Sequence, residues 1–190
     1  MFFLVATAHS QELLREDFDS LWFVQYQVYP YSTATDTTST GSRSGAFSIM
    51  FNGSNGLNDD PYVIFNPIDI TQYDSVVVSL AYSASGPDSG DDLLLELSFD
   101  GGITWANTLK LVDGYSNALV SWDSTSSAKP ETAISNPATM AVPDHETSLT
   151  IRVRFDEKAG SNNSGDYYFI DDLAVTGKPA TTYEIQILSE

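Results

Sequence analysis

The chain of 190 residues contains no cysteine and only two histidines. The absence of cysteine excludes disulfides, zinc–thiolate centres and thiol nucleophiles. Basic residues are also scarce, because eight Lys and Arg stand against twenty-six Asp and Glu, which gives a formal net charge of -18. Such a surface repels nucleic-acid phosphates and anionic lipid headgroups, so neither is expected as a partner. After the N-terminal residues, no stretch is long and apolar enough to be inserted in a membrane as a helix.

The N-terminus begins with a short apolar run, MFFLVATAHS. The small residues at the end of this run are typical of the cleavage site of a secretory signal peptide, although the usual basic segment before it is missing. We interpret residues 1–11 as the remnant of a signal peptide, which predicts a secreted, extracellular or cell-surface protein. The alternative is that the same residues form an apolar first strand.

The rest of the chain shows β-rich runs separated by turn residues, and no sustained helical period. We expect strands at residues 13–18, 21–28, 46–51, 62–65, 75–84, 93–99, 103–112, 149–155 and 167–176. This pattern predicts an all-β fold, a two-sheet antiparallel β-sandwich that spans residues 12–177.

Two of these runs alternate clearly. In LTIRVRF, residues 149–155, the apolar side chains fall on every second position, so Thr150, Arg152 and Arg154 are expected on the solvent face. In residues 93–99 the side chains expected to point inward are those of Leu93, Leu95, Leu97 and Phe99. The glycines of Asp100-Gly-Gly tolerate positive φ, which predicts a tight hairpin directly after this strand.

The connections at residues 32–44, 52–60 and 156–166 are polar and long. Residues 124–143 are expected to be irregular, because three prolines interrupt any ladder there. Residues 178–190 begin with a Pro-containing hinge and then alternate Tyr183, Ile185 and Ile187. We interpret them as a linker, the start of a further domain, or a donor strand that pairs elsewhere, since an uncovered edge strand would be a liability.

Several runs of sequence occur in a fixed order along residues 13–177. They are Leu14-Arg-Glu-Asp17-Phe18-Asp19, Ser42-Arg-Ser-Gly45, Asp60-Pro-Tyr62, Tyr73-Asp-Ser-Val, the hairpin Ser98-Phe-Asp100-Gly-Gly-Ile-Thr-Trp105 and the closing strand Tyr168-Phe-Ile170-Asp171-Asp172-Leu-Ala-Val175. In this order they resemble the cleaved-adhesin and MAM-like jelly-roll domains of secreted bacterial surface proteins. The hairpin combined with the closing Ile-Asp-Asp run is the most specific part of the resemblance.

The resemblance implies a jelly roll with structural calcium, of the kind found in adhesin regions of cell-surface proteases and in polysaccharide-degrading enzymes. The sequence departs from the family pattern in two places. The glycine and proline that usually follow the opening strand are replaced by Ser20-Leu-Trp22, and residues 124–143 have no counterpart in the pattern. These departures bear on any transfer of ligand residues from the family.

Calcium is the cofactor that the acidic residues favour, because Ca²⁺ takes six to eight hard oxygen ligands. The first and last strands of a jelly roll lie close together, so acids of both ends can meet. At least one of the adjacent Asp171 and Asp172 must face the interior or its rim, where a carboxylate needs a cation, hydrogen bonds or a proton. The predicted metal ligands are Asp17, Asp19, Asp171 and Asp172, to which the resemblance adds Asp60 or its neighbour Asp59. The alternative is that these acids cap turns or pair with Arg152 and Arg154.

Two further features carry weaker hypotheses. The acids at residues 88, 91 and 92 are either a calcium loop or an ordinary polar turn, and the full calcium-loop pattern is missing. His145 is the one histidine outside the N-terminal run that could act as a general base, but no G-x-S-x-G elbow accompanies it. We therefore expect a loop histidine and no enzyme activity.

Sugar binding requires exposed aromatic faces with polar groups beside them. The predicted ligand-binding residues are Tyr29, Tyr31, Tyr115 and Trp122, with Tyr26 as a further candidate, because they lie at strand ends or in loops. The alternative is that these aromatics pack in the core, as Trp105 is expected to do.

Together these features predict a non-catalytic, calcium-stabilised binding module, adhesin-like, that recognises a glycan or an extracellular protein. One alternative is a structural subunit of an extracellular filament that assembles by strand exchange through residues 178–190. Another is an accessory domain of a larger secreted hydrolase.

Overall fold

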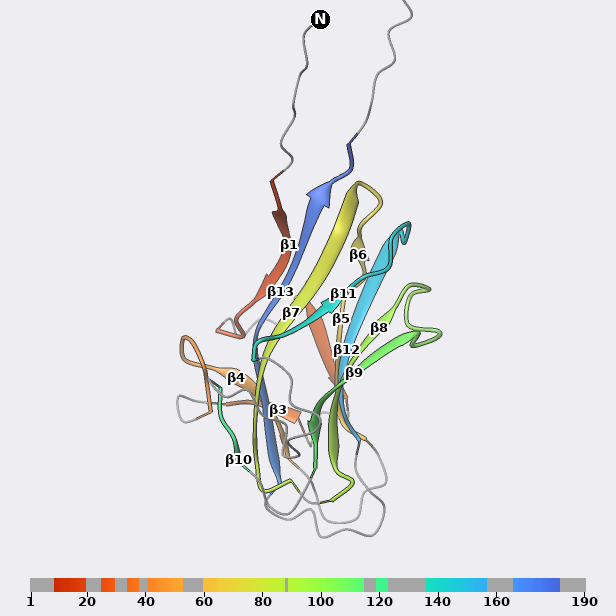
Figure 1. Ribbon diagram of the computed structural model, residues 1–190. Coiled ribbons are helices and arrows are strands. Elements are labelled where there is room, and N and C mark those ends of the chain that lie inside the picture. The colour runs from red at the N-terminus through yellow and green to blue at the C-terminus, as the bar shows by residue number, and fades with distance from the viewer. Residues whose placement is uncertain are drawn as a thin grey trace, which may run out of the picture.

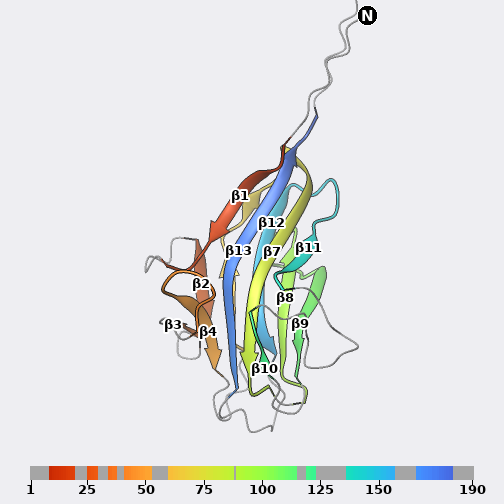
Figure 2. The same ribbon diagram turned by 60° about the vertical axis from the view of Figure 1, so that its left-hand side comes forward.

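The computed structural model describes residues 9–19, 25–29, 34–37, 41–52, 60–87, 89–114, 119–122, 136–156 and 166–181, with the backbone alone for residues 34–37 and 119. All regular secondary structure in these ranges is β-strand, and the strands form two sheets that lie as two layers (Figures 1 and 2). Within the same ranges no helix is present that could cross a membrane. The predicted all-β class is confirmed.

The larger sheet contains the seven strands β1 (Gln11–Glu16), β3 (Ala34–Thr37), β4 (Ser48–Asn52), β7 (Tyr73–Ser85), β10 (Leu119–Val120), β11 (Ala138–Ala141) and β13 (Tyr167–Pro179). The smaller sheet contains the six strands β2 (Tyr26–Tyr29), β5 (Tyr62–Phe65), β6 (Ile68–Asp69), β8 (Asp92–Ser98), β9 (Asn107–Asp113) and β12 (Ser148–Asp156). Every strand pair among the described residues is antiparallel.

Crossover connections link the two sheets. The order in the larger sheet is β10-β7-β13-β4-β3, with β11 also on β7 and β1 also on β13. The order in the smaller sheet is β2-β5-β12-β8-β9, with β6 also on β12. The first strand therefore pairs with the last, and β1 begins at the end of the sandwich where β13 finishes (Figure 1). This is the jelly-roll sandwich that the sequence predicts.

The core lies between the two sheets and is built from alternate residues of each strand. From the smaller sheet it takes Leu93, Leu95, Leu97, Leu149, Ile151, Val153 and Phe155. From the larger sheet it takes Ile49, Phe51, Val78, Leu80, Tyr82, Tyr168 and Ile170. Burying this much apolar surface is the main term that holds the two layers together, at roughly 25 cal/mol per Å² removed from water.

Most of the predicted strands are present, and the positions of their ends agree less closely. β5 has the predicted bounds, and β8 and β12 differ from them by one residue at each end. β9 begins at Asn107 instead of residue 103, because the Asp100 carboxylate accepts hydrogen bonds from the N–H groups of Ile103 and Thr104 and keeps both in the turn. β13 continues to Pro179, so residues 178 and 179, expected in the hinge, still pair with β7.

Four short strands were not predicted. β3 lies in the run of residues 32–44 that we expected to be a loop, and β11 lies in the proline-rich run 124–143. Both expectations were wrong for these residues, because an edge strand needs ladder bonds on one side only. β11 pairs with β7 immediately after Pro137, and β3 pairs with β4. The remaining two, β6 and β10, have only two residues each.

Candidate functional site

The two termini bring acidic residues to one place. β1 and β13 run antiparallel with Glu16 opposite Leu173, so Asp17 follows β1 where Asp172 stands on β13. Phe18, two residues after the end of β1, and Asp172 of β13 both have positive φ, 55° and 48°, and the pairing of β13 with β7 shifts register just after Asp171. The predicted convergence of acids from the first and last strands is therefore present in the backbone.

The 42–47 turn, which precedes β4, is held between these acids. Asp171 Oδ2 accepts hydrogen bonds from the backbone N–H groups of Arg43 (2.8 Å) and Ser44 (3.1 Å). Asp19 Oδ1 accepts hydrogen bonds from the N–H groups of Ala46 (2.6 Å) and Phe47 (3.0 Å). Two carboxylates from opposite ends of the chain thus bind four N–H groups of one turn.

Gly45 at the centre of this turn cannot be replaced without disturbance. Its φ is +58°, in the left-handed region that glycine tolerates best. In addition, Asp19 Oδ2 would lie 1.7 Å from a Cβ built on Gly45, so the carboxylate occupies the space of any side chain. The approach of Asp19 to the turn depends on this glycine.

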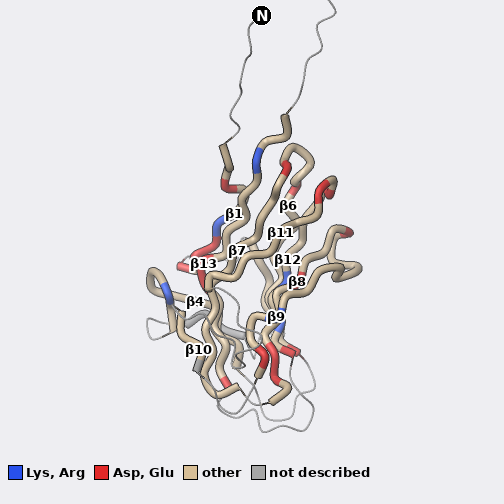
Figure 3. Tube along the Cα trace, in the orientation of Figure 1, with Lys and Arg blue, Asp and Glu red and all other residues tan. Residues whose placement is uncertain are grey.

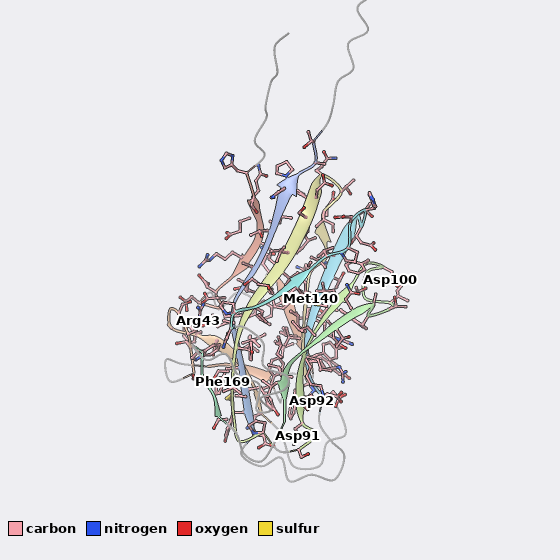
Figure 4. All side chains as sticks on the ribbon, viewed as in Figure 1. Arg43, Asp91, Asp92, Asp100, Met140 and Phe169 are labelled. Carbon is pink, nitrogen blue, oxygen red and sulfur yellow. The ribbon has the colours of Figure 1, made fainter. Side chains whose placement is uncertain are left out.

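Asp172 holds the side chains of the same turn. Its Oδ2 pairs with Arg43 Nη1 at 2.8 Å, and its Oδ1 accepts a hydrogen bond from Ser44 Oγ at 2.8 Å. Its own N–H donates to Asp171 Oδ1 at 2.8 Å. Asp171 is fully buried, and this burial raises the pKa of its carboxyl even though three N–H groups favour the ionised form. Figure 4 shows Arg43 beside β13 and β4.

These contacts limit how calcium could be held. Among the described residues, no group of three or more Asp, Glu or His side chains is gathered closely enough to hold a metal ion. Asp171 and Asp172 already use their oxygens for hydrogen bonds. Asp17 and Asp19 each keep one carboxylate oxygen, Oδ2, that accepts no hydrogen bond from a described residue. Carboxylate oxygens are the hard ligands that Ca²⁺ prefers, so Asp17 and Asp19 would be the first residues to coordinate an ion here.

Asp60 lies apart from the other predicted ligands. It precedes β5 of the smaller sheet, and its Oδ2 pairs with Arg154 Nη1 at 2.7 Å. For this residue the structure shows the alternative of pairing with Arg154, so we leave it out of the calcium site. Asp59 and Asp88 lie outside the described residues. Asp92 pairs with Lys110, and Asp91 is buried at the β7–β8 turn (Figure 4).

A second cluster lies on the outer face of the smaller sheet, the face turned away from the core. Tyr29 of β2 stands directly opposite Tyr62 of β5, and their rings stack with centroids 5.1 Å apart at an interplanar angle of 30°. The Arg152 guanidinium of β12 lies 5.6 Å from the Tyr62 ring centroid and 4.0 Å from that of Trp105. We call Tyr29, Tyr62, Arg152 and Trp105 the aromatic row.

Buried charge orients the middle of the aromatic row. Glu96 of β8 is only 4% exposed, and its Oε2 accepts a hydrogen bond from Arg152 Nε at 2.6 Å and lies 3.4 Å from Arg154 Nε. Arg154 also pairs with Asp60 and Asp156. Arg152 and Arg154 therefore lie on the outer face as predicted, but half-buried and paired, not freely solvated.

The hairpin between β8 and β9 positions Trp105. The Asp100 carboxylate accepts hydrogen bonds from Ser98 Oγ, from the Ile103 N–H, and from both the N–H and the hydroxyl of Thr104. The bonds from Thr104 are the largest cause that lowers the pKa of Asp100 to about 2. A Cβ added to Gly102 would lie within 4 Å of both Trp105 and Ile64. Trp105 thus lies against Arg152 of β12 on the outer face, instead of entering the core as expected.

The family model for Reelin subrepeat B matches residues 33–176. The chain belongs to this family. The matched range contains all of β4 and β7 and the part of β13 up to Thr176 that pairs with them. No curated protein matches the chain.

Solved structures agree with this assignment at the level of the fold. The K3 cleaved adhesin domain of Lys-gingipain from Porphyromonas gingivalis W83 is 14% identical, covers 88% of this chain and 100% of its own, and has a TM-score of 0.52. The resemblance to cleaved-adhesin jelly rolls is therefore confirmed. The K2 domain of Lys-gingipain (15% identity, 85% and 96% coverage, TM-score 0.49) and a carbohydrate-binding module in complex with β-1,4-galactotriose (15% identity, 87% and 97% coverage, TM-score 0.46) were also found.

Within this Reelin subrepeat B domain, the predicted ligand-binding aromatic residues differ in position and exposure. Tyr29 is 55% exposed and belongs to the aromatic row. Tyr26 is buried in the core, and Trp122 is half-buried after β10. Tyr31 and Tyr115 lie outside the described residues. His145 is exposed in the turn between β11 and β12.

Sequence reasoning missed three members of the row, namely Tyr62, Trp105 and Arg152. The signal for Tyr62 and Arg152 was their alternation with buried residues, which places each on an outer face. Their mutual contacts follow from the order β2-β5-β12-β8 in the sheet, which the alternation does not reveal.

Proposed function

We propose that this domain is a non-catalytic recognition module of an exported protein, and that it binds a glycan on the outer face of its smaller sheet. The observation that carries the proposal is Tyr29, a tyrosine on a strand, 55% exposed and stacked on a second tyrosine. An exposed aromatic ring that is held by its neighbours offers a flat apolar surface to the C–H face of a sugar ring.

The surroundings of Tyr29 supply the polar groups that such a site needs. Arg152 lies two strands away in the sheet order and can donate to hydroxyl groups, and the buried Glu96 on the next strand holds it in place. The β-1,4-galactotriose complex named above and the adhesin domains of Lys-gingipain support a binding role on this kind of fold. An extracellular protein is the second candidate for the ligand. Export of the protein is supported by its apolar N-terminal run.

Replacement of Tyr29 by alanine is expected to weaken glycan binding by about tenfold or more, because the stacked ring is lost while the sheet remains. A glycan array probed with the whole chain identifies a ligand, and calorimetry then compares the affinities of the two proteins. Tyr167→Ala is the matched control, since Tyr167 is an exposed strand tyrosine of the larger sheet. Binding to no glycan, or equal losses in both variants, would refute the proposed function.

We also propose that calcium stabilises the end of β1. Asp17 and Asp19 are its main ligands, and Asp171 and Asp172 are further acids beside the ion. EDTA is then expected to lower the melting temperature by several degrees, since a ligand present at a hundred times its Kd stabilises the folded state by about 2.7 kcal/mol. Differential scanning calorimetry with EDTA and with excess CaCl2, together with metal analysis, measures this.

Two variants locate the ion. Asp17→Asn should abolish the difference between EDTA and CaCl2, because it removes a carboxylate at the proposed site. Asp60→Asn, whose carboxylate pairs with Arg154 on the other sheet, should preserve it. A wild-type protein that binds no calcium and melts at the same temperature in both buffers would contradict the calcium proposal.

A further inference from the structure

Arg152 is fixed before any ligand arrives. Its Nε donates to Glu96 Oε2 at 2.6 Å, and its guanidinium lies 4.0 Å from the centroid of the Trp105 ring. Trp105 is itself held by the 98–105 hairpin, in which the Asp100 carboxylate accepts hydrogen bonds from Ser98, Ile103 and Thr104. A planar guanidinium held in this way loses little further freedom when it donates to a ligand.

The two amino groups of Arg152 are available to a ligand. Arginine has five N–H donors, and only the one on Nε is engaged. No hydrogen bond or ion pair joins either Nη atom of Arg152 to another residue in the part of the chain that the structure describes. The side chain lies on the outer face of the smaller sheet and is 19% exposed, so part of it is open to a ligand.

The charge around Arg152 favours an uncharged ligand. Arg152 and Arg154 are opposed by three carboxylates, those of Glu96, Asp60 and Asp156. A ligand carboxylate or sulfate would add a fourth negative charge to two guanidinium groups, within a chain of net charge -18. Hydroxyl oxygens accept the same hydrogen bonds without this repulsion.

The open aromatic face of the row is that of Tyr29. The Tyr62 ring stacks on Tyr29 and is approached by Arg152, and the Trp105 ring is covered by Arg152 and approached by Gly102. Tyr29 and Arg152 are two strands apart, which is about 10 Å at the usual spacing of strands. This separation exceeds the width of one sugar ring.

We infer that the ligand is an uncharged oligosaccharide of at least two sugar rings that lies across β2, β5 and β12. One ring stacks on Tyr29, and hydroxyl groups of a neighbouring ring accept hydrogen bonds from the two Nη groups of Arg152. This inference rests on the proposed function. It adds the charge of the ligand, its minimum length and the residue that binds its second ring, Arg152. Trp105 and Glu96 are positioning residues that fix Arg152.

The test uses the whole chain and β-1,4-linked oligomers of glucose, galactose and xylose with one to six rings. Oligomers of glucuronic acid serve as the anionic match for glucose. We expect binding of at least one neutral series, an affinity gain of about tenfold or more between one ring and two or three, and weaker binding of the acidic oligomers. Arg152→Met, which keeps the length of the side chain, should abolish the gain with length and leave the weak binding of one ring intact.

The fluorescence of Trp105 gives a second readout, which is measured on the wild-type protein. Binding of the longer oligomers to the wild-type protein should change tryptophan fluorescence, and this change should be absent in Trp105→Phe, where Tyr29 is retained. Binding of neutral oligomers with the same gain in Arg152→Met, or preference for the glucuronic acid series, overturns the inference but leaves the proposed function in place. Binding of no saccharide at all overturns both.

Discussion

Asp171→Ala is expected to lower the free energy of unfolding by about 2–4 kcal/mol, measured by urea denaturation. Asp171 is fully buried, and its carboxylate accepts hydrogen bonds from the N–H groups of Arg43, Ser44 and Asp172. Alanine leaves these three donors without their acceptor and releases the 42–47 turn from β13. The size of the loss depends on how well water can reach the freed N–H groups.

Two neighbouring variants separate this role from simple loss of charge. Asp172→Ala removes only the contacts with Arg43 and Ser44 at a partly exposed position, so a loss of about 1 kcal/mol is expected. Asp171→Asn keeps one carbonyl acceptor but turns an amide donor toward an N–H group, so an intermediate loss is expected. An Asp171→Ala protein as stable as Asp172→Ala would show that the three N–H bonds contribute little.

The pKa of Asp171 gives this prediction a pH dependence. Burial is the main reason that the pKa of this carboxyl is raised above 3.8 in the folded state. A raised pKa means that the folded protein binds the proton more tightly than the unfolded chain does. The contribution of this group to stability is therefore largest below pH 3.8 and declines as pH rises through the interval up to the folded pKa. Asp171→Asn should lack this decline.

Glu96→Ala is expected to cost about 2–4 kcal/mol, because it leaves two half-buried guanidinium groups side by side without the carboxylate that they share. The loss stays below that of a fully buried pair, since both arginine side chains are about 20% exposed and Arg154 keeps Asp60 and Asp156. Thermal and urea unfolding of the variant measure the effect, and the stacking of Arg152 on Trp105 should loosen at the same time.

A matched series distinguishes lost pairing from lost packing. Glu96→Gln retains the shape and one acceptor oxygen, and should cost about half as much as alanine. The double variant Glu96→Met with Arg152→Met removes both charges of the closest pair and should recover part of the stability. If the single and double variants lose the same free energy, Glu96 acts through packing and the ion pair contributes nothing measurable.

The predicted strands show where local pattern is sufficient. Residues 149–155 and 93–97 alternate so clearly that their buried and outer faces follow directly, and the structure has Leu93, Leu95, Leu97 and Phe155 in the core. The short strands β3 and β11 could not be predicted in this way. Their formation depends on an open edge of another strand: β11 pairs with β7, more than fifty residues earlier, and β3 pairs with β4, which follows it along the chain.

The acidic residues show a similar division. The interruption of an apolar strand by Asp171 and Asp172 indicates that at least one carboxylate must be satisfied in or near the interior, and Asp171 is buried. What satisfies it is the 42–47 turn, more than a hundred residues earlier in the chain. Whether a cation joins this arrangement depends on Asp17 and Asp19, whose remaining oxygens the sequence does not distinguish from those of other acids.

By itself, the sequence determined the properties that depend on composition and on neighbouring residues: an acidic, cysteine-free β-sandwich, the faces of its long strands, and the family pattern that ends in Ile170-Asp171-Asp172. Which outer-face residues meet depends on the three-dimensional arrangement of the strands. Tyr29, Tyr62, Arg152 and Trp105 come from four separate parts of the chain, and the order of β2, β5, β12 and β8 in the sheet brings them together. The physical reason is that side-chain direction is set within each strand, whereas lateral neighbours are set by backbone pairing between distant strands.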